Sequence, residues 1–437
     1  MTTTIDVLVT HGTVLTVDAA DTVIDDGAVA IRDGAIVAAG PTGALAAAHP
    51  ATTTLDAGGG IVLPGLVNAH THLAMTMFRG FADDCDLQGF LDRLFPVEAA
   101  VLSADTVAIG VELAVAEQLR AGITAALDMF WFPEAAGAVA DRAGFRLHHG
   151  PVFVGALGPD GTSFSDRLAA LPDWFSAAGA GGRWVFPHST YTLEPRQLQA
   201  IAETARTFGA RIHTHAAENA VEVATVLDRH GRRPVELLDH LGLLGPDVVL
   251  AHTVDLTPGE IEMMASTGTV AVHNPASNLK LASGFAPVPA LDAAGVTVAL
   301  GTDGCASGND LDLFAAMRLA ATIHKAHTGD ATVLPAARVL RMATIDGARA
   351  LGLGATLGSL EVGKRADVVV LHADRPHLVP TYDPVSTVVY AAGRGDVRHV
   401  LVDGRVVVED GECLTIDVAG AIAAMRNLAR TVAGRSR

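Results

Sequence analysis

The two ends of the chain share one pattern of apolar and polar positions. Residues 1–60 hold short apolar or alternating runs separated by Asp-Gly and Gly-Gly pairs, a pattern typical of strands joined by turns. Runs of the same kind recur near the C-terminus as ADVVVLHAD (366–374), STVVYAAG (386–393) and VRHVLVDGRVVVEDGECL (397–414). Neither end is long enough to bury a good core alone. The pattern therefore predicts a single discontinuous β domain.

The middle of the chain repeats a different pattern. Continuous apolar runs alternate with Ala-, Leu-, Glu- and Arg-rich segments of helical spacing, which indicates parallel strands buried on both faces. Eight such units over about 240 residues favour a (β/α)8 barrel, and on periodicity alone an open doubly wound sheet is the alternative. The eight runs cover residues 61–70, 123–129, 146–154, 184–190, 210–218, 248–254, 269–275 and 296–303.

Five of these runs end in residues that can bind a metal ion or move a proton. The active site of a barrel lies at the C-terminal ends of its strands, so these residues are expected to converge on one mouth although they are spread over the sequence. In chain order they are His70 with His72, His188, His215 with Glu218, His252, and Asp303.

This set suits a catalytic metal. His70 and His72 are two residues apart, so on a strand their side chains point to one face and can hold one ion. His215 and Asp303 would complete a shell of three nitrogens and one oxygen that leaves a position for water. The ion would lower the pKa of that water to about 7, and Glu218 could shuttle its proton.

Each residue also has a structural interpretation. A single His-x-His pair is weak support for a metal, and His213 and His215 form a second pair in which one member is expected to be structural. Asp303 could belong to a Gly-Thr-Asp-Gly turn. Four strand ends that each carry a suitable ligand are nevertheless hard to obtain from packing needs alone. Ordinary packing is the preferred interpretation for His148, His149 and Cys305.

Composition and charge indicate which classes of binding partner and which cellular compartment to expect. Asp and Glu outnumber Lys and Arg by 48 to 30, for a net charge of −18, which argues against nucleic acid or an anionic membrane. The mean hydropathy is +0.36, yet no uncharged apolar run reaches the roughly 18 residues of a membrane span. The first residues lack the pattern of a signal peptide, and three cysteines without paired spacing suggest a reducing compartment. We expect a cytoplasmic homo-oligomer that acts on a small molecule.

Five motifs in order resemble those of the amidohydrolase superfamily, in its cytosolic aminohydrolase branch. They are PGLVNAHTH (64–72), HAAE (215–218), AHTVDL (251–256), VHNPASNLKL (272–281) and GTDGCASGNDLDLFAAMR (301–318). The branch includes the methylthioadenosine/S-adenosylhomocysteine deaminases and the triazine hydrolases, and the similarity covers nearly the whole chain. We therefore predict an α/β protein. A (β/α)8 TIM barrel (63–356) would carry a discontinuous small β-sandwich domain formed by both chain ends (1–62 and 357–437).

The resemblance implies a role for each matched residue. The metal ligands would be His70, His72, His215 and Asp303. Glu218 would protonate the ring nitrogen next to the attacked carbon, His252 would hold the attacking water and the developing alkoxide, and Asp303 would take the water proton. Barrel hydrolases with two metals often bridge them with a lysine on the fourth strand, and none of the three lysines lies near residues 184–190. One divalent ion per chain is expected, zinc first and Fe²⁺ as the alternative.

Two further matches concern the substrate. RLFPVEAAVL (93–102) resembles a segment of adenosine-type deaminases whose glutamate binds ribose hydroxyls, which would be Glu98. PHSTYTL (187–193) resembles their fourth-strand motif, whose histidine, here His188, contacts the purine. A structural alternative for Glu98 is a helix-start carboxylate after Pro96, favoured by the helix dipole.

The substrate itself stays open. Members that process S-adenosylhomocysteine carry an arginine near the end of the third strand, and RLHHGPVFV (146–154) ends without one. Phe130, Trp131 and Phe132 could form an apolar wall for a 5′ group or be ordinary packing. The expected function is a metal-dependent hydrolytic deaminase of an adenine nucleoside, of the adenosine, 5′-methylthioadenosine or S-adenosylhomocysteine type. The alternative is an aminohydrolase or chlorohydrolase of another aminated heterocycle, and a barrel kept only as a scaffold is a poor third.

Overall fold

Both ends of the chain contribute strands to one mixed sheet. The computed structural model describes residues 4–177 and 179–435. Strand β5 from the N-terminal part pairs antiparallel with β16 from the C-terminal part, with Val62 opposite Val370. The two ends therefore share one sheet, in agreement with their common pattern. Its strands are β1 (Ile5–Leu15), β2 (Val23–Arg32), β3 (Ala35–Pro41), β4 (Ala51–Asp56), β5 (Ile61–Pro64), β16 (Val368–Leu371), β17 (Val397–Val402), β18 (Arg405–Glu409) and β19 (Glu412–Cys413).

The middle of the chain forms a TIM barrel of parallel strands. Each of the eight apolar runs contributes to it, although 61–64 of the first run is β5 of the terminal sheet. Runs three and eight are each interrupted, so that β8 and β9, and β14 and β15, continue one another. The barrel strands are β6 (Leu66–His72), β7 (Ile123–Asp128), β8 (Arg146–His148), β9 (Val152–Phe153), β10 (Trp184–Pro187), β11 (Arg211–Ala216), β12 (Val248–His252), β13 (Val270–His273), β14 (Val298–Leu300) and β15 (Asp303–Gly304).

A buried pair of side chains closes the barrel between its first and last strands. The side-chain Nδ2 of Asn68 donates to the hydroxyl of Thr302 at 2.8 Å, and the Thr302 backbone N–H donates to the side-chain Oδ1 of Asn68 at 3.0 Å. The end of the last strand, β15, then pairs with β6 through Asp303 and Thr71. Two residues more than 200 positions apart in sequence are thereby fixed next to one another.

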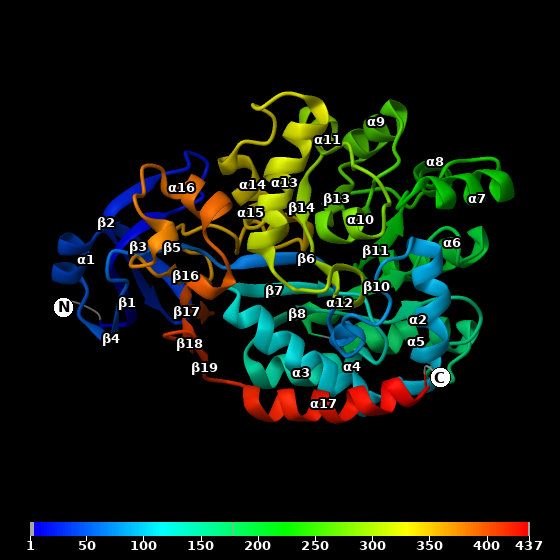
Figure 1. The fold of residues 1–437 in the computed structure, drawn as a ribbon, viewed down its shortest axis with the longest axis horizontal. Helices are drawn as coiled ribbons and strands as arrows, with labels where there is room; N and C mark the ends of the chain where they lie inside the picture. Colours follow the sequence, from blue (N-terminus) through cyan, green and yellow to red (C-terminus); the bar gives the residue numbers. More distant parts are fainter. Residues whose placement is uncertain (1–3, 178, 436–437) are drawn as a thin grey trace.

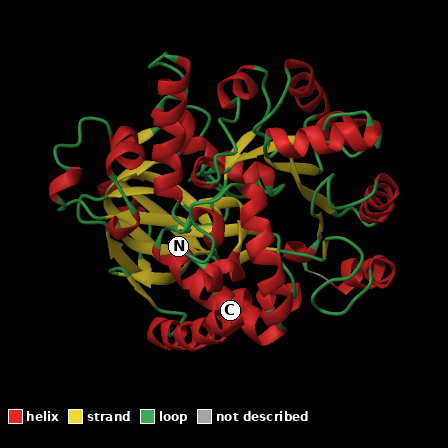
Figure 2. Ribbon diagram, turned by 45° about the vertical axis from the view of Figure 1, so that its right-hand side comes forward, coloured by secondary structure: helices red, strands yellow, loops and turns green. Residues whose placement is uncertain are grey.

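Helices surround the barrel strands (Figure 2). Several begin where a side chain accepts hydrogen bonds from their first free N–H groups; α3, for example, starts at a capping box made by Ser103 and Thr106. The helices of this layer are α2 (Leu87–Val101), α3 (Ala104–Arg120), α4 (Pro133–Ala143), α5 (Phe164–Ala177), α6 (Pro195–Thr207), α7 (Ala220–His230), α8 (Pro234–His240), α9 (Pro258–Thr267), α10 (Pro275–Lys280), α11 (Val288–Ala293), α12 (Cys305–Gly308), α13 (Leu313–Thr328), α14 (Ala336–Met342) and α15 (Ile345–Ala350).

The C-terminal part departs from an all-β pattern in two places. The run 386–393 forms no strand: helix α16 (Pro384–Ser386) continues into a π-helical turn, Thr387–Ala391. The Asp383 side chain accepts from the N–H groups of Val385 and Ser386, and this cap overrides the β propensity of the run. The chain then ends in α17 (Val418–Arg435), drawn red in Figure 1, which packs against α3 and α2 of the barrel.

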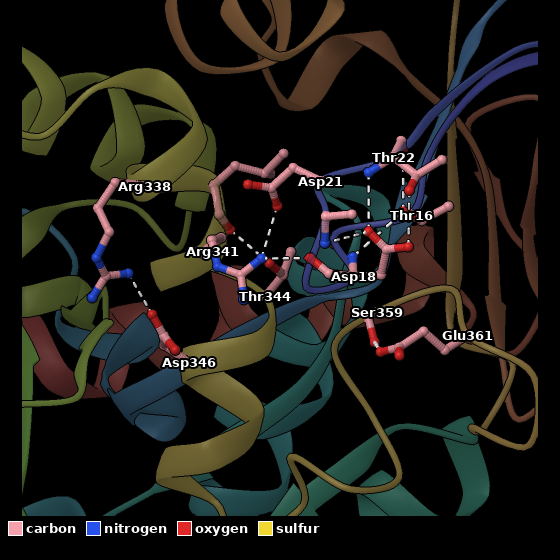
Figure 3. A network of polar contacts seen from close by, with 12 residues as sticks. Thr16, Asp18, Asp21, Thr22, Arg338, Arg341, Thr344, Asp346, Ser359 and Glu361 are labelled. Carbon is pink, nitrogen blue, oxygen red and sulfur yellow. Dashed lines mark hydrogen bonds and ion pairs between the residues drawn. The ribbon is translucent and has the colours of Figure 1, made fainter.

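Polar contacts join the terminal sheet to the barrel. Arg341 of α14 donates to the Asp18 carbonyl at 2.8 Å and to Asp21 Oδ1 at 2.7 Å in the loop after β1 (Figure 3). On the other side, Arg146 of β8 pairs with Asp367 at 3.1 Å and Asp403 at 2.6 Å. These contacts fix how the barrel sits on the sheet.

No single helix within residues 4–177 and 179–435 is long and apolar enough to cross a bilayer. Helices α2 and α3 reach that length and composition only when taken together, and the pair is bent by 118°. Residues on both helices belong to the large buried apolar cluster, among them Phe90, Leu94, Val107 and Val111.

The junction between the two chain ends predicts a sensitive glycine. A Cβ at Gly60 would lie 1.9 Å from the carbonyl oxygen of Leu371, at the end of β16, so Gly60→Ala must push the two ends apart. We expect a destabilisation of about 1–3 kcal/mol, as for other overpacked sites, visible as a lower Tm in calorimetry. Gly43→Ala is the matched control: it lies in the short helix α1 (Thr42–Ala48) with open space around its Cβ and should leave Tm unchanged or slightly raised. Equal Tm values for both variants would contradict the tight junction.

Candidate metal centre and active site

The four predicted ligands lie together at the C-terminal ends of barrel strands. His70 and His72 stand on β6, His215 on β11 and Asp303 on β15, and the most exposed of them is 8% accessible. The Oδ1 atom of Asp303 lies 3.4 Å from His70 Nε2 and 3.2 Å from His72 Nε2. The potential ligand atoms of His70, His72 and His215 all lie within 4.8 Å of one another, and so do those of His70, His252 and Asp303. Each group could hold an ion, and His70 belongs to both.

The hydrogen bonds of the three histidines aim their free nitrogens at this centre. The partners of the Nδ1 atoms are His213 Nε2 for His70 (2.7 Å), the Met129 carbonyl for His72 (2.5 Å) and the His188 carbonyl for His215 (2.9 Å). A carbonyl only accepts, so Nδ1 of His72 and His215 must donate, and in the neutral ring the lone pair is then on Nε2. His70 Nε2 is buried without a hydrogen-bond partner. This donor set fits a divalent ion with nitrogen and oxygen ligands, such as zinc.

His213 determines which nitrogen of His70 faces the centre. Its Nδ1 lies 3.0 Å from the Val249 carbonyl and therefore donates. Burial lowers the pKa of His213 well below its ordinary value, so the ring is neutral and its Nε2 accepts the Nδ1–H of His70. This chain leaves the His70 Nε2 lone pair directed at the site. The His-x-His spacing alone left open which histidine of 213 and 215 is structural, whereas the resemblance implied His215 as the ligand. These contacts support a structural role for His213.

Glu218 and His252 face one another beside the ligands. Glu218 Oε1 lies 3.8 Å from His252 Nε2. His252 is oriented from behind by Asn278, whose Oδ1 lies 2.9 Å from His252 Nδ1. The Glu218 backbone N–H donates to Glu222 Oε2 at 2.6 Å, so a second buried carboxylate holds the loop that carries Glu218.

Burial shapes the charges of these acids. It raises the pKa of Glu218 and, helped by the nearby Glu218 charge, raises that of Glu222 to about 7. For Asp303, burial acts in the same direction, but contacts with His70 and His72 outweigh it and hold the pKa well below the usual range. The site therefore combines a carboxylate kept ionised with one that holds a proton more readily, the division needed for acid–base chemistry.

Backbone strain marks the same place. Ala217, His252 and Asp303 have φ values of 52°, 73° and 58°, in the left-handed region that non-glycine residues rarely adopt. Such strain costs free energy and collects at functional sites where the surrounding structure enforces it. Here it lies next to Glu218 and at two of the residues that could meet an ion.

Glu98 is buried inside a helix and not at a helix start. Helix α2 begins at Leu87 and runs through Pro96, which places Glu98 in its last turns. The helix-start alternative is therefore wrong. Near the C-terminus of a helix, where Glu98 lies, the helix dipole disfavours a carboxylate. Glu98 Oε1 has no hydrogen-bond partner, and burial raises the pKa of Glu98 to about 8. Its side chain lines the same cavity as the ligands.

The cavity in front of the ligands has a volume of about 520 Å³. His188 lines it as the sequence predicts, with its ring 4.6 Å from that of His215. Phe130 and Trp131 also line it, whereas Phe132 caps α4 outside the lining. Part of the wall was not predicted: it comes from α2 and from the loop after β9, and includes Leu87, Phe90, Leu91, Leu94, Phe95 and Leu157.

The family model described as "Amidohydrolase family" matches residues 61–407. The chain belongs to the amidohydrolase family. Its resemblance to that family, stated from the motifs, is thus confirmed. The chain is 46% identical to a 5-methylthioadenosine/S-adenosylhomocysteine deaminase of Syntrophobacter fumaroxidans, with 98% of both chains covered. It is 40% identical to a 5′-deoxyadenosine deaminase of Methanosarcina mazei, with 94% of this chain and 95% of that protein covered.

Two zinc-containing solved structures have a fold similar to that of this chain. An adenosine deaminase from Xanthomonas campestris with bound zinc superposes with a TM-score of 0.95 at 38% identity, covering 98% of this chain and 99% of that one. The atrazine chlorohydrolase of Arthrobacter aurescens with zinc gives 0.88 at 26% identity, covering 97% and 100%. The amidohydrolase chain thus has neighbours that act on purine nucleosides and others named for triazines.

The residues predicted to be ordinary packing, His148, His149 and Cys305, do not line the cavity. His148 accepts from Trp184 Nε1 at 3.1 Å, and His149 packs against Trp174 at a ring distance of 5.8 Å. Cys305 is buried, which raises the pKa of its thiol. The helical spacing of the apolar residues at 87, 90, 91 and 94 was the signal that could have revealed the α2 wall.

The His213 chain predicts an effect on metal affinity. His213→Ala removes the acceptor of the His70 Nδ1–H, so His70 can turn or change tautomer. We expect zinc affinity, measured by competition with a chelator, to fall by about 10–100-fold, as for other residues that support metal ligands. His148→Ala is the control, since it also removes a buried imidazole but touches none of the ligands. Equal losses in both variants would show only a general loosening of the barrel.

Proposed function

We propose that this chain is a metal-dependent hydrolytic deaminase of an adenine nucleoside, giving the inosine analogue and ammonia. One observation carries the proposal: a buried carboxyl with an unpartnered oxygen, Glu98, lines the same cavity as the ligand cluster and Glu218. That pairing suits a substrate with hydroxyl groups at one end and a reacting ring at the other. The names of the relatives at 46% and 40% identity support the same substrate class.

We propose one divalent ion, zinc in first place and Fe²⁺ as the alternative. His70, His72, His215 and Asp303 would hold it through the nitrogen and oxygen atoms that face the centre. Bound there, such an ion supplies a water molecule of lowered pKa, which is a nucleophile at neutral pH. The zinc in the Xanthomonas campestris neighbour supports this choice.

The proton chemistry is assigned to three residues. Asp303, held ionised by its neighbours, would accept a proton from the attacking water. Glu218, whose pKa is raised by burial, would give a proton to the ring nitrogen beside the attacked carbon. The Nε2 atom of His252 faces Glu218 and would stabilise the oxygen that develops on that carbon. Asp303 would pass the water proton to the amino group, which leaves as ammonia, and Glu218 would regain a proton from the hydroxyl group on the attacked carbon as the carbonyl forms.

Substrate recognition is assigned to Glu98 and His188. In its ionised form, the buried Glu98 can accept hydrogen bonds from two neighbouring hydroxyl groups, and bonds to a charged acceptor are the strong kind. Such donors would favour the ionised form against the burial that raises its pKa. His188 is held by Ser189 and Thr192 at 3.2 and 3.3 Å from its Nδ1, which leaves its other edge for the ring. A different aminated heterocycle is the second candidate, supported by the triazine-hydrolase fold neighbours.

We propose that the terminal sheet is a β-sandwich domain built from 1–62 and 357–437 around the barrel, 63–356. Side chains from strands of both chain ends pack into one apolar cluster, which supports a sheet folded over on itself. The cluster includes Val9, Val29, Ile31, Val62, Val368, Val370 and Leu401. Helix α17 falls within these bounds but packs against α3 and α2 of the barrel and adds no strand to the sheet.

The acid–base assignment predicts a separation of metal binding from turnover. Glu218→Gln keeps the size of the side chain but cannot carry the proton. Elemental analysis should still give about one equivalent of zinc per chain, and the ammonia released from adenine nucleosides should fall by about 10²–10⁴-fold. Loss of the metal in this variant would mean that Glu218 is a ligand. A wild type that releases ammonia only from triazines, pterins or free bases would transfer the proposal to the second candidate.

The ribose assignment predicts a loss that depends on the substrate. Glu98→Ala removes the acceptor for the 2′ and 3′ hydroxyls, and an unmade bond to a charged group costs about 1.5–3 kcal/mol. kcat/KM for an adenosine-type substrate should therefore fall by at least about tenfold. The 2′,3′-dideoxy analogue never makes these bonds, so its kcat/KM should change little between wild type and variant. A wild type that treats both substrates alike would remove this role from Glu98.

A further inference from the structure

The cavity becomes apolar away from the ligands. Beyond Glu98, its lining includes Leu91, Phe95, Trp131, Val154 and Leu157. Leu157 and Phe95 are 66% and 37% exposed, which places them at the opening. In an adenine nucleoside the reacting carbon and the ribose lie at opposite ends of the purine. With the reacting carbon at the ligands, a 5′ substituent must extend toward this apolar end.

No cation lines this end. Among the described residues that line the cavity there is neither arginine nor lysine. Arg167 stands behind the wall, where its guanidinium lies 5.1 Å from the Trp131 ring. Its Nη2 donates to both oxygens of Asp160, at 2.6 and 2.7 Å. This positive charge is thus paired with a carboxylate.

The loop at the opening offers few free donors. The N–H of Gly158 donates to the Thr162 carbonyl at 3.1 Å, and that of Gly161 to the Gly158 carbonyl at 3.0 Å. The Thr162 N–H donates to Asp160 Oδ1 at 3.0 Å, and Pro159 has no N–H to give. A carboxylate that reached this loop would therefore have to break bonds that the loop makes with itself.

Two neutral hydroxyl groups also line the cavity. Tyr191 packs against His188 with a ring distance of 5.9 Å and its hydroxyl has no hydrogen-bond partner, whereas Ser307 donates to Asp303 Oδ2 at 2.7 Å. Neither hydroxyl carries the positive charge that would pair with a carboxylate.

We infer that the site selects adenine nucleosides with an uncharged, apolar 5′ group, such as 5′-methylthioadenosine and 5′-deoxyadenosine, over S-adenosylhomocysteine. This inference rests on the proposed deaminase function and narrows it. A methyl or methylthio group can pack against the aromatic and aliphatic wall, where sulfur–aromatic contacts are favourable. The amino-acid end of S-adenosylhomocysteine carries a carboxylate and an ammonium. If the carboxylate is buried here, no arginine or lysine of the lining can pair with its charge.

The test compares kcat/KM for four substrates on the zinc-loaded, full-length chain: 5′-methylthioadenosine, 5′-deoxyadenosine, adenosine and S-adenosylhomocysteine. Both apolar substrates should exceed S-adenosylhomocysteine by at least about tenfold, because an unpaired buried charge costs at least that factor. Adenosine, with a neutral 5′ hydroxyl, should fall between them. Equal or better turnover of S-adenosylhomocysteine would overturn the inference while leaving the deaminase function intact. Ammonia from none of the four would overturn the function, and the inference with it.

A variant tests the cause of the preference. Leu157→Arg places a cation at the opening on a side chain that is already exposed, and it should raise the ratio of kcat/KM for S-adenosylhomocysteine to that for 5′-methylthioadenosine by about tenfold, since a paired carboxylate no longer carries that cost. Val362→Arg is the matched control: Val362 is 69% exposed and lies in the terminal part, away from the cavity, so its ratio should equal that of the wild type. An unchanged ratio in a folded Leu157→Arg protein would overturn the missing cation as the cause.

Discussion

The burial of Asp303 against His70 and His72 is the contact on which the rest of the site depends. A carboxylate out of water is costly unless it is paired, and here the partners are imidazoles that must themselves stay neutral or share its charge. Backbone carbonyls, His213 and Ser307 hold these groups in place through bonds on their far sides. The cluster is thus a network in which a hydrogen bond to the surrounding protein holds each ligand side chain. A bound cation would give His70 Nε2, which has no hydrogen-bond partner, a group to contact.

The fold supplies the rigidity that such a cluster needs. Asn68 and Thr302 close the barrel through two buried hydrogen bonds. Asn68 precedes His70 by two residues, and Thr302 directly precedes Asp303. The strands that carry the ligands can therefore not separate without breaking buried hydrogen bonds. The terminal sheet adds support on the outside, because Arg146 and Arg341 tie barrel elements to its turns. The strained backbone at Ala217, His252 and Asp303 persists because this frame leaves it no alternative.

Sequence periodicity favoured the barrel over an open doubly wound sheet, and polar residues at several strand ends indicated where candidate ligands would meet, because both signals come from local patterns. A single His-x-His pair was weak support, and the prediction depended on suitable residues at four strand ends. The misplaced features depend on distant contacts. Pro96 stays inside α2 because it and Asp92 lie on the exposed side, where water can replace the lost bond. The run at 386–393 became helical because Asp383 caps it. The part played by His213 requires Val249, which is 36 residues away.

Glu98 shows how a local cost can indicate a ligand. A buried carboxyl with an unpartnered oxygen lowers stability in the free protein, and α2 brings no cation or donor to relieve it. Most such groups in proteins find a partner. The apolar face that holds Glu98 in place is the same face that forms the cavity wall, so the helix presents one polar group within an otherwise apolar surface. A substrate that brings hydroxyl groups to that point and an apolar substituent beside it would satisfy both features at once, whereas a bare heterocycle would satisfy neither.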